Sequence, residues 1–312
     1  MKPAASIIFF TTLAGSAQGV ALTVAAASLT GAAPASAASA AGMLWFAAAT
    51  LLVALISSFF HLGHPERAWR TVLMWRTSWM SREVIVLPAF IVVVAAWALL
   101  LTLGRGRSAG VTALACAAIV LAFALWYCTA MIYACIRFIP EWAHPLTIVN
   151  YSAIGIASGL VTACALSAAF GDADFAGALT PWAIAATVLA CLLRVVSLRR
   201  NARLAPKSTL QSATGIRSPH VQQKSMGMTG GSFNTREFFH DASPRIYRAM
   251  KPTFLLLAFA VPVVLLGVGW AAEMPGIAML AAFVQLVGVL AERWFFFAQA
   301  NHPQNLYYQV VS

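Results

Sequence analysis

The densest group of residues that could carry proton chemistry lies between Phe59 and Pro88, in the stretch FFHLGHPERAWRTVLMWRTSWMSREVIVLP. It holds two histidines, two glutamates, four arginines and three tryptophans, and apolar runs border it on both sides. Histidine and glutamate can pass protons near neutral pH. We expect this stretch to form the polar end of a quinone pocket, where two membrane helices meet a short interfacial loop.

His61 and His64 are three positions apart at the end of the second apolar run, so they share a helix face if that helix continues past them. Each can serve as a hydrogen-bonded helix cap, or as a proton donor and hydrogen-bond partner to a quinone carbonyl. Glu83 opens the third apolar run after Ser81 and Arg82. We expect a helix to begin here, where Glu83 either complements the helix dipole or, if it faces His61, relays protons.

A second polar group lies in the last apolar run, where Gln285, Glu292 and Gln299 are spaced by seven residues and share one helix face. A carboxylate inside a membrane is costly and needs a partner or a function. Two interpretations of this polar stripe stay open: structural pairing of Glu292, and a role in proton or quinone chemistry. The helical period directs Arg293 elsewhere, and we expect it to find another partner.

The composition defines the class of protein. Of the 312 residues, 61% are hydrophobic and 9% are charged, whereas about a quarter of the residues in soluble domains are charged. Several apolar runs reach the roughly 20 residues that span a bilayer, which indicates a polytopic membrane protein. The net charge of +11 could also attract nucleic acid, but membrane topology itself requires basic loops, so we expect no nucleic-acid partner.

We expect an all-α protein in which one domain, residues 1–312, forms a bundle of eight transmembrane helices. The first apolar run is rich in small residues and contains Gln18, which favours packing against other helices over contact with lipid. The predicted spans are residues 6–30, 41–62, 84–104, 110–136, 148–170, 180–198, 252–272 and 276–300.

The basic residues are distributed unevenly between the two ends of such a bundle. Eight spans place both termini at one end, and that end receives 17 of the 20 lysines and arginines, Arg194 included, whereas the opposite loops contain Arg105 and Arg107. The positive-inside rule then predicts cytoplasmic termini. The basic loop 199–251 lies at the same end and is either a flexible linker near anionic lipid or a docking strap for a cytoplasmic partner.

Few residues suggest a metal site. The five cysteines lie in apolar runs without the spacing of metal ligands and are interpreted as small core residues. The six histidines lie at span ends or in loops, which disfavours a buried haem b with two histidine ligands. His61 or His64 paired with His144 or His302 stays an alternative. We expect no metal site within this chain.

Three stretches, FHLGHPERAW at 60–69, WMSRE at 79–83 and ERWFFFA at 292–298, resemble the membrane anchor subunit of dimethyl sulfoxide reductase-type molybdoenzymes. The resemblance covers nearly the whole chain and implies a quinone-reactive subunit in the bacterial inner membrane, with ubiquinone or menaquinone as its cofactor. It implies two partners that hold the metal cofactors, a four-cluster iron–sulfur subunit and a molybdopterin catalytic subunit. The quinol-site histidine and glutamate of the family fall on His61 and Glu83. With the neighbouring side chains, the expected quinone site comprises His61, His64, Arg67, Trp69, Arg82 and Glu83.

Residues 230–239 and the tail from 292 to 309 look more like the branch of this family that serves sulfite dehydrogenases. Cytoplasmic termini agree with a cytoplasmic sulfite-oxidising complex that reduces quinone. The alternatives are an anchor of a dimethyl sulfoxide reductase-type complex that oxidises menaquinol, a purely structural anchor, and a transporter. A transporter is disfavoured because the sequence shows no internal repeat and its polar residues gather at one face.

Overall fold

The computed structural model of the chain describes residues 1–31, 35–60, 62–106, 108–206, 208–225 and 238–306. Within these ranges the structure is helical and contains no strand, and eight helical segments are long and apolar enough to cross a membrane. The prediction of an all-α protein with eight spans is confirmed. The spans are α1 (Ala5–Thr30), α2 (Ala37–Phe59), α3 (Trp79–Thr102), α4 (Ala109–Ala134), α5 (Pro145–Ala169), α6 (Ala173–Asn201), α9 (Pro244–Leu255) continued by η2 (Leu256–Ala260) and α10 (Val261–Ala271), and α11 (Ile277–Ala298); the shorter elements are η1 (Pro65–Met74), α7 (Leu210–Thr214) and η3 (Pro303–Leu306).

The sixth span begins seven residues before the apolar run that predicted it at 180–198. Asp172 caps α6, because its side chain accepts a hydrogen bond from the Phe175 amide at 3.4 Å. An aspartate at this position stabilises a helix start but lowers the hydropathy of the sequence around it. Hydropathy alone therefore placed this helix start too late.

The seventh span was predicted at 252–272 and begins earlier, at Pro244. Ser243 is its N-cap, and a capping serine followed by proline is a common way to begin a helix. The predicted loop 199–251 is consequently shorter, because helices occupy both of its ends and residues 202–243 alone connect α6 to α9. The other six spans agree with their predicted limits to within five residues.

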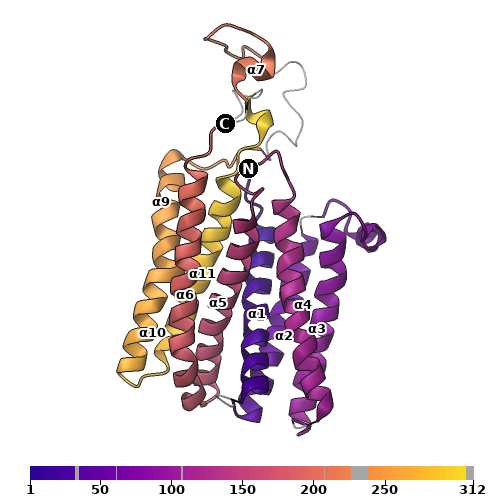
Figure 1. The fold of residues 1–312 in the computed structure, drawn as a ribbon, viewed down its shortest axis with the longest axis vertical. Coiled ribbons are helices and arrows are strands. Elements are labelled where there is room, and N and C mark those ends of the chain that lie inside the picture. The colour runs from indigo at the N-terminus through magenta and orange to yellow at the C-terminus, as the bar shows by residue number, and fades with distance from the viewer. Residues whose placement is uncertain (32–34, 61, 107, 207, 226–237, 307–312) are drawn as a thin grey trace.

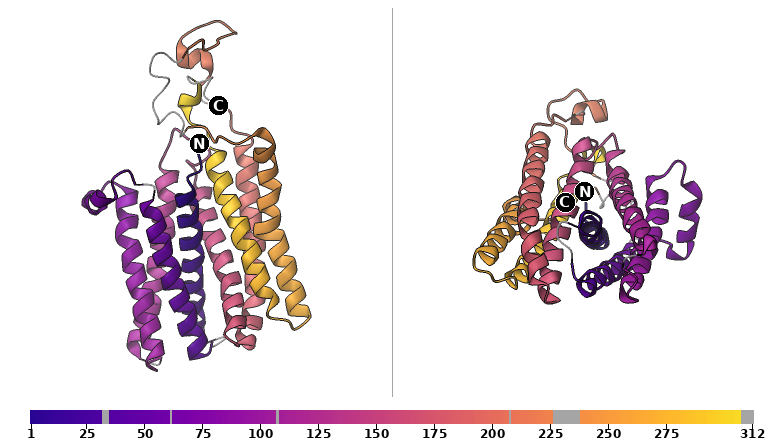
Figure 2. Two further views of the ribbon diagram at one scale, coloured as in Figure 1. Left: turned by 180° about the vertical axis from the view of Figure 1, so that it is seen from behind. Right: turned by 60° about the horizontal axis from the view of Figure 1, so that its bottom comes forward.

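Helix α1 lies in the middle of the bundle (Figure 2) and contacts α2, α4, α5 and α11. Its closest approach is to α5, where Gly15 and Gly19 meet Gly155 and Gly159, and a Cβ atom added to Gly159 would overlap the backbone of Gly19. Small residues four positions apart on two facing helices allow such an approach in membranes. Gln18 is fully buried. The predicted packing of the first span against other helices is confirmed.

A proline determines the shape of the seventh span. Pro262 has no N–H, so the Ala258 carbonyl four residues earlier lacks its ordinary intrahelical donor. The helix widens there into the π-helical turn η2, and Nε2 of Gln285 on α11 donates a hydrogen bond to Ala258 O at 3.1 Å. Gln285 thus satisfies a backbone group that a helix in lipid cannot leave unpaired.

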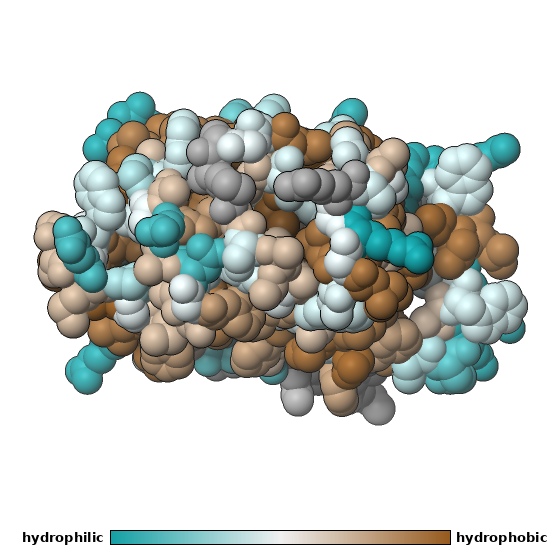
Figure 3. Space-filling model, turned by 90° about the horizontal axis from the view of Figure 1, so that it is seen from below, coloured by the Kyte–Doolittle hydropathy of each residue, from teal (hydrophilic) through white to brown (hydrophobic). Residues whose placement is uncertain are grey.

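The N-terminus and the last described residues, up to Leu306, lie at one end of the bundle (Figure 1). We call this the loop end, because the connections 60–78, 135–144 and 202–243 all lie there. Helix η1 lies beside the bundle at the level of the loop end. Seen from the opposite end, hydrophilic side chains are scattered among apolar ones (Figure 3). The loop end, where the three connections lie together, therefore offers a surface on which a partner could dock.

Candidate functional site

His61 lies outside the described residues, so its predicted role stays a prediction. Helix α2 ends at Phe59 with Phe60 as its C-cap, and His64 begins η1 as the N-cap of that 3-10 helix. Helix α2 therefore does not continue to His64, which was the condition for a helix face shared by the two histidines. His64 is exposed, and its Nδ1 lies 2.9 Å from Oε1 of Glu66, so it pairs with a carboxylate at the surface.

Glu83 lies in the second turn of α3 with its side chain in the bundle interior, where it is 8% exposed. The helix begins at Trp79, because the Ser78 hydroxyl accepts a hydrogen bond from the Ser81 amide at 3.3 Å. The predicted helix start was therefore wrong, since it lay too late in the sequence. The Thr129 hydroxyl of α4 donates a hydrogen bond to Oε1 of Glu83. A carboxyl group at membrane depth with a hydroxyl donor is suited to hold and release a proton.

Arg82, near the start of α3, donates hydrogen bonds to the loop between α2 and α3. Its Nε donates to the Trp75 carbonyl at 2.9 Å, and its Nη2 donates to the Arg76 carbonyl at 2.8 Å. The same guanidinium lies 4.0 Å from the centre of the Trp79 ring. Arg82 thus determines how the loop leaves the helix that carries Glu83.

Arg67 and Trp69 lie on η1, which has no buried residue. Nε of Arg67 lies 3.8 Å from Oε1 of Glu66. Trp69 is 64% exposed, and the apolar side chains of Leu73 and Met74 are exposed to a similar extent. Arginine, tryptophan and aliphatic side chains exposed together fit the headgroup region of a membrane. The structure therefore places Arg67 and Trp69 on an interfacial helix, outside the interior that holds the third-span carboxylate.

A cluster of buried charges joins α6 to α11. Nε of Arg194 lies 2.7 Å from Oε1 of Glu292, and Nε of Arg293 lies 3.5 Å from Oε2 of the same carboxylate. All three side chains are almost completely buried. Arg293 therefore shares Glu292 instead of pairing elsewhere, which corrects the prediction. Arg194 belongs to the bundle interior, so its charge no longer counts among the 17 that the sequence assigned to the side of the termini.

The predicted polar stripe of α11 lies in the interior along its whole length, but its three members make different contacts. Gln285 donates to the Ala258 carbonyl, Glu292 pairs with the two arginines, and Gln299 is the buried C-cap residue of the helix. The stripe thus contacts η2 through Gln285 and α6 through Glu292, and it ends at the C-cap of the helix.

Two tyrosines connect the region of Glu83 to the charged cluster. Tyr133 lies one turn after Thr129 on α4 and stacks on Tyr151 of α5, with 5.9 Å between ring centres. The Arg293 guanidinium lies 3.9 Å from the centre of the Tyr151 ring. Sequence reasoning missed Thr129 and Tyr151. The available signal was a polar side chain within an apolar span, which is weak because hydroxyls can also bond to their own helix backbone.

The loop end gathers titratable groups around the N-terminus. The Met1 amine donates a hydrogen bond to the Ala300 carbonyl at 2.8 Å, and Nζ of Lys2 lies 3.0 Å from Oδ2 of Asp241. Burial lowers the pKa of the Met1 amine to about 6, and the nearby Glu141 carboxylate acts in the opposite direction. A cavity of about 650 Å³ lies between Met1, the end of the long loop and the tail. These contacts join three distant parts of the chain into one surface.

His144 and His302, the alternative haem ligands, both make local contacts. Nδ1 of His144 accepts a hydrogen bond from the Leu146 amide at 3.1 Å and thereby caps α5. Burial and the positive charge of Arg200 lower the pKa of His144. The His302 ring stacks on Phe238 with 3.9 Å between ring centres. These contacts give both side chains structural roles at the loop end.

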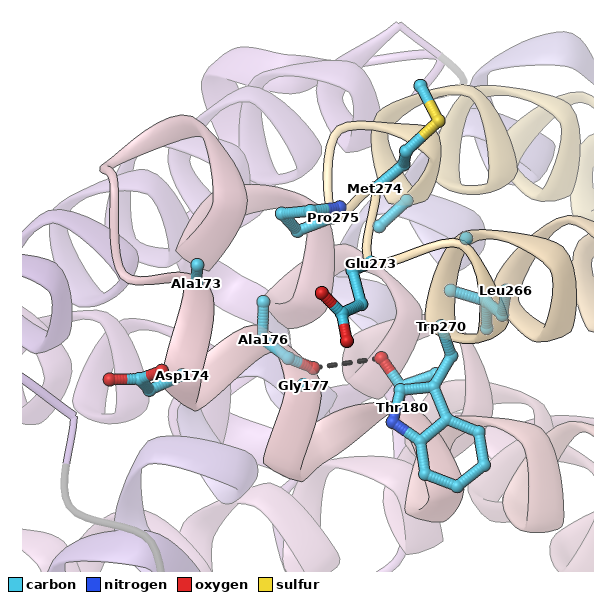
Figure 4. A pocket seen from close by; sticks show the side chains of 12 residues that line it. Ala173, Asp174, Ala176, Gly177, Thr180, Leu266, Trp270, Glu273, Met274 and Pro275 are labelled. Atoms are coloured by element: carbon cyan, nitrogen blue, oxygen red, sulfur yellow. Dashed lines mark hydrogen bonds between the residues drawn. The ribbon is translucent and has the colours of Figure 1, made fainter.

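A cavity of about 490 Å³ lies at the opposite end, between α6 and the turn that joins α10 to α11 (Figure 4). Glu273 and Trp270 line it together with Thr180, whose hydroxyl donates to the Ala176 carbonyl at 2.8 Å. This cavity is separated from the Glu83 region by the length of the bundle. It is not part of the candidate site.

Comparison with known proteins shows the family of the chain. Residues 1–299 match the family described as DMSO reductase anchor subunit (DmsC). The chain is also 45% identical, over 328 aligned positions that cover the whole of both chains, to a sulfite dehydrogenase subunit from Allochromatium vinosum (strain ATCC 17899 / DSM 180 / NBRC 103801 / NCIMB 10441 / D). Both matches extend across the eight spans. The chain therefore belongs to the family of dimethyl sulfoxide reductase anchor subunits, and it is a multi-pass membrane anchor of an oxidoreductase complex.

Proposed function

We propose that this anchor is quinone-reactive and passes electrons between an iron–sulfur subunit and the quinone pool of the membrane. The name of its relative from Allochromatium vinosum supports a role in sulfite oxidation at a molybdopterin catalytic subunit. In that direction the electrons arrive from the iron–sulfur partner, and quinone is the acceptor. The family description alone would fit equally an anchor that oxidises menaquinol.

The observation that carries this proposal is the Glu83 carboxyl, buried in the membrane-spanning part of the chain near the loop end and bonded by Thr129. A bound quinone accepts two electrons and two protons and leaves as quinol. Oε of Glu83 would hold one of these protons, and the donor hydrogen bond from Thr129 fixes the carboxyl in one orientation. His61 would hold the other, because an unperturbed histidine has a pKa of about 6.5.

The proposal joins a residue of the loop that follows α2 to a residue of α3. Helices α2 and α3 pack against each other, and α2 ends and α3 begins at the loop end. The last turn of α2 therefore lies beside the first turns of α3, which supports a site shared by Glu83 and the loop that follows α2. His64, Arg67, Trp69 and Arg82 would form the outer wall of the site, where η1 and the loop meet the lipid headgroups.

The charge distribution supports a bacterial inner-membrane protein with cytoplasmic termini. The sequence still assigns 16 of the 20 lysines and arginines to the side of the termini when Arg194 is left out, and basic residues concentrate on the cytoplasmic side. The iron–sulfur subunit would then dock in the cytoplasm, on the surface that Met1, Asp241 and Asn305 help to form around the 650 Å³ cavity.

The test compares His61→Ala and Glu83→Gln with the wild-type chain in the assembled complex. We expect sulfite-dependent reduction of a soluble dye to persist, because the dye takes electrons before they reach the membrane. Quinone-linked turnover should fall at least about tenfold, a cautious lower bound for loss of a general acid. Exposed Tyr127 on α4 offers a control, and Tyr127→Phe should keep both activities. Full quinone activity in both site variants, with normal assembly, would refute the proposal.

A further inference from the structure

The first of two small internal cavities lies just inside the loop end, between α5, α6 and α11. Its volume is about 10 Å³, close to the space that one water molecule needs. The buried atoms of its lining that have no hydrogen-bond partner within the described residues include Oε2 of Glu141, Oδ1 of Asn150, the Tyr151 hydroxyl, Nη2 of Arg194 and Nε2 of Gln299. A buried polar atom without a partner costs about 1–3 kcal/mol, and a water molecule can make two to four hydrogen bonds. This cavity is therefore suited to a bound water.

The second cavity lies deeper in the bundle, between α1, α4 and α5, and also measures about 10 Å³. Oγ1 of Thr12, Oε1 of Gln18 and Nε1 of Trp126 line it, and they too are buried without a hydrogen-bond partner in the described part of the chain. By the same reasoning it is suited to one water. Thr129 lines this cavity as well, and its hydroxyl is the donor to Glu83. The deeper cavity thus ends at the proposed proton-holding carboxyl.

Tyr151 and Arg293 line both cavities and so connect them. A tyrosine hydroxyl can accept one hydrogen bond while it donates another, so it can pass a proton on without a lasting change of charge. Arginine has donors only and stays protonated, so Arg293 can orient its neighbours but cannot relay. The single relaying side chain shared by the two cavities is therefore Tyr151.

The charged groups around the two cavities distinguish Glu83 from the other carboxyls. Glu141 lies at the loop end, where the Met1 amine and Arg200 act on it. In the interior, Glu292 pairs with the guanidiniums of Arg194 and Arg293. Glu83 instead accepts a hydrogen bond from the neutral Thr129 hydroxyl, so it is the interior carboxyl best suited to take up a proton.

We propose that the two cavities and Tyr151 form an internal proton route from Glu141 at the loop end to the Glu83 carboxyl. Each passage moves one proton inward, from water at the loop end through the first cavity, the Tyr151 hydroxyl, the second cavity and Thr129. No electron moves along this line. The inference deepens the proposed function. It rests on that function in one respect, which is the use of the proton at Glu83.

The test measures hydrogen–deuterium exchange at Glu83 by infrared spectroscopy of the purified full-length chain in lipid nanodiscs. At a pH low enough to protonate the carboxyl, its C=O band is identified as the band that Glu83→Gln removes. After transfer to D₂O, the shift of this band reports how fast deuterons reach Glu83. In Tyr151→Phe we expect the shift to be at least about tenfold slower than in wild type, because the relay lacks its connecting hydroxyl.

Two further variants make the outcome decisive. Thr12→Val removes a hydroxyl of the deeper cavity at nearly constant volume and should also slow the exchange, whereas Tyr127→Phe, which changes a tyrosine outside both cavities, should not. Exchange as fast as in wild type in both Tyr151→Phe and Thr12→Val would overturn the route. The measurement needs no quinone and no partner, so its result is independent of the quinone assays on His61 and Glu83.

Discussion

The hydrogen bond between Thr129 and Glu83 gives a sharp test of the candidate site, because it can be removed almost without a change of shape. Thr129→Val replaces a hydroxyl by a methyl group at a buried position of α4. A hydrogen bond to a charged group contributes about 1.5–3 kcal/mol. Without it the Glu83 carboxyl has lost the donor that fixes its orientation and that stabilises the carboxylate after the proton leaves.

The size of the expected effect follows from this energy. About 1.36 kcal/mol corresponds to a tenfold change in rate, so we expect quinone-linked turnover to fall between about tenfold and a hundredfold if the whole interaction acts in the transition state. Dye reduction at the catalytic subunit should not change. Thr129→Ser keeps a hydroxyl at the same position and should recover most of the lost rate.

The assay follows sulfite oxidation in membranes with a short-chain quinone and, in parallel, with a soluble dye, for the wild type and both Thr129 variants. The ratio of the two activities corrects for differences in assembly. Equal quinone-linked rates in wild type and Thr129→Val would show that the hydrogen bond has no part in turnover. A Thr129→Ser variant as slow as Thr129→Val would show that the methyl group, and so packing, determines the rate.

Three other predictions concern stability and orientation. Glu292→Gln should destabilise the chain by about 3–5 kcal/mol, since it leaves two buried guanidiniums without their carboxylate; graded unfolding in detergent measures this, and a loss under about 1 kcal/mol would contradict the pairing. A reporter fused after Ser312 should show cytoplasmic activity, because the basic residues gather at the loop end; periplasmic activity would reverse the orientation. Burial lowers the pKa of the Met1 amine from its ordinary value near 8 to about 6. Between about pH 6 and pH 8 the unfolded chain therefore binds more protons than the folded chain, and stability should rise with pH across that window. Glu141→Gln should extend the rise to lower pH, and a flat or falling pH profile in wild type would refute the burial of the amine.

The spans could be predicted from the sequence because the length of an apolar run is set by the thickness of the bilayer. The ends of the spans could not be predicted in this way, because helix starts depend on local capping residues. Asp172 and Ser243 add turns to α6 and α9 outside the apolar core, and Ser78 begins α3 before the residues that were expected to do so. Each of these caps is a polar residue at a place where hydropathy indicates only a loop.

The candidate site could be predicted only in part, because its contacts join residues of different spans. The resemblance pointed to Glu83, and the structure places it in the interior with a donor. Arg194 was counted with the basic residues on the side of the termini because it lies near the end of an apolar run, and only the approach of α11 shows that Glu292 pairs with it. Thr129 and Tyr151 likewise gain their importance from neighbours on other helices. Contacts between distant spans cannot be read from the pattern of a single span.

The location of the entry to the proton route has a consequence for energy conversion. Oε1 of Glu141 accepts a hydrogen bond from Asn301 in the tail at 3.0 Å, so the entry lies on the same end of the bundle as the proposed docking surface. Electrons from the partner and protons from water would then reach Glu83 from one side. Moving one elementary charge across a membrane at 100 mV requires about 2.3 kcal/mol, but electrons and protons that enter from the same side carry no net charge across. Quinone reduction at this site would therefore be electroneutral, and its rate would not depend on the membrane potential.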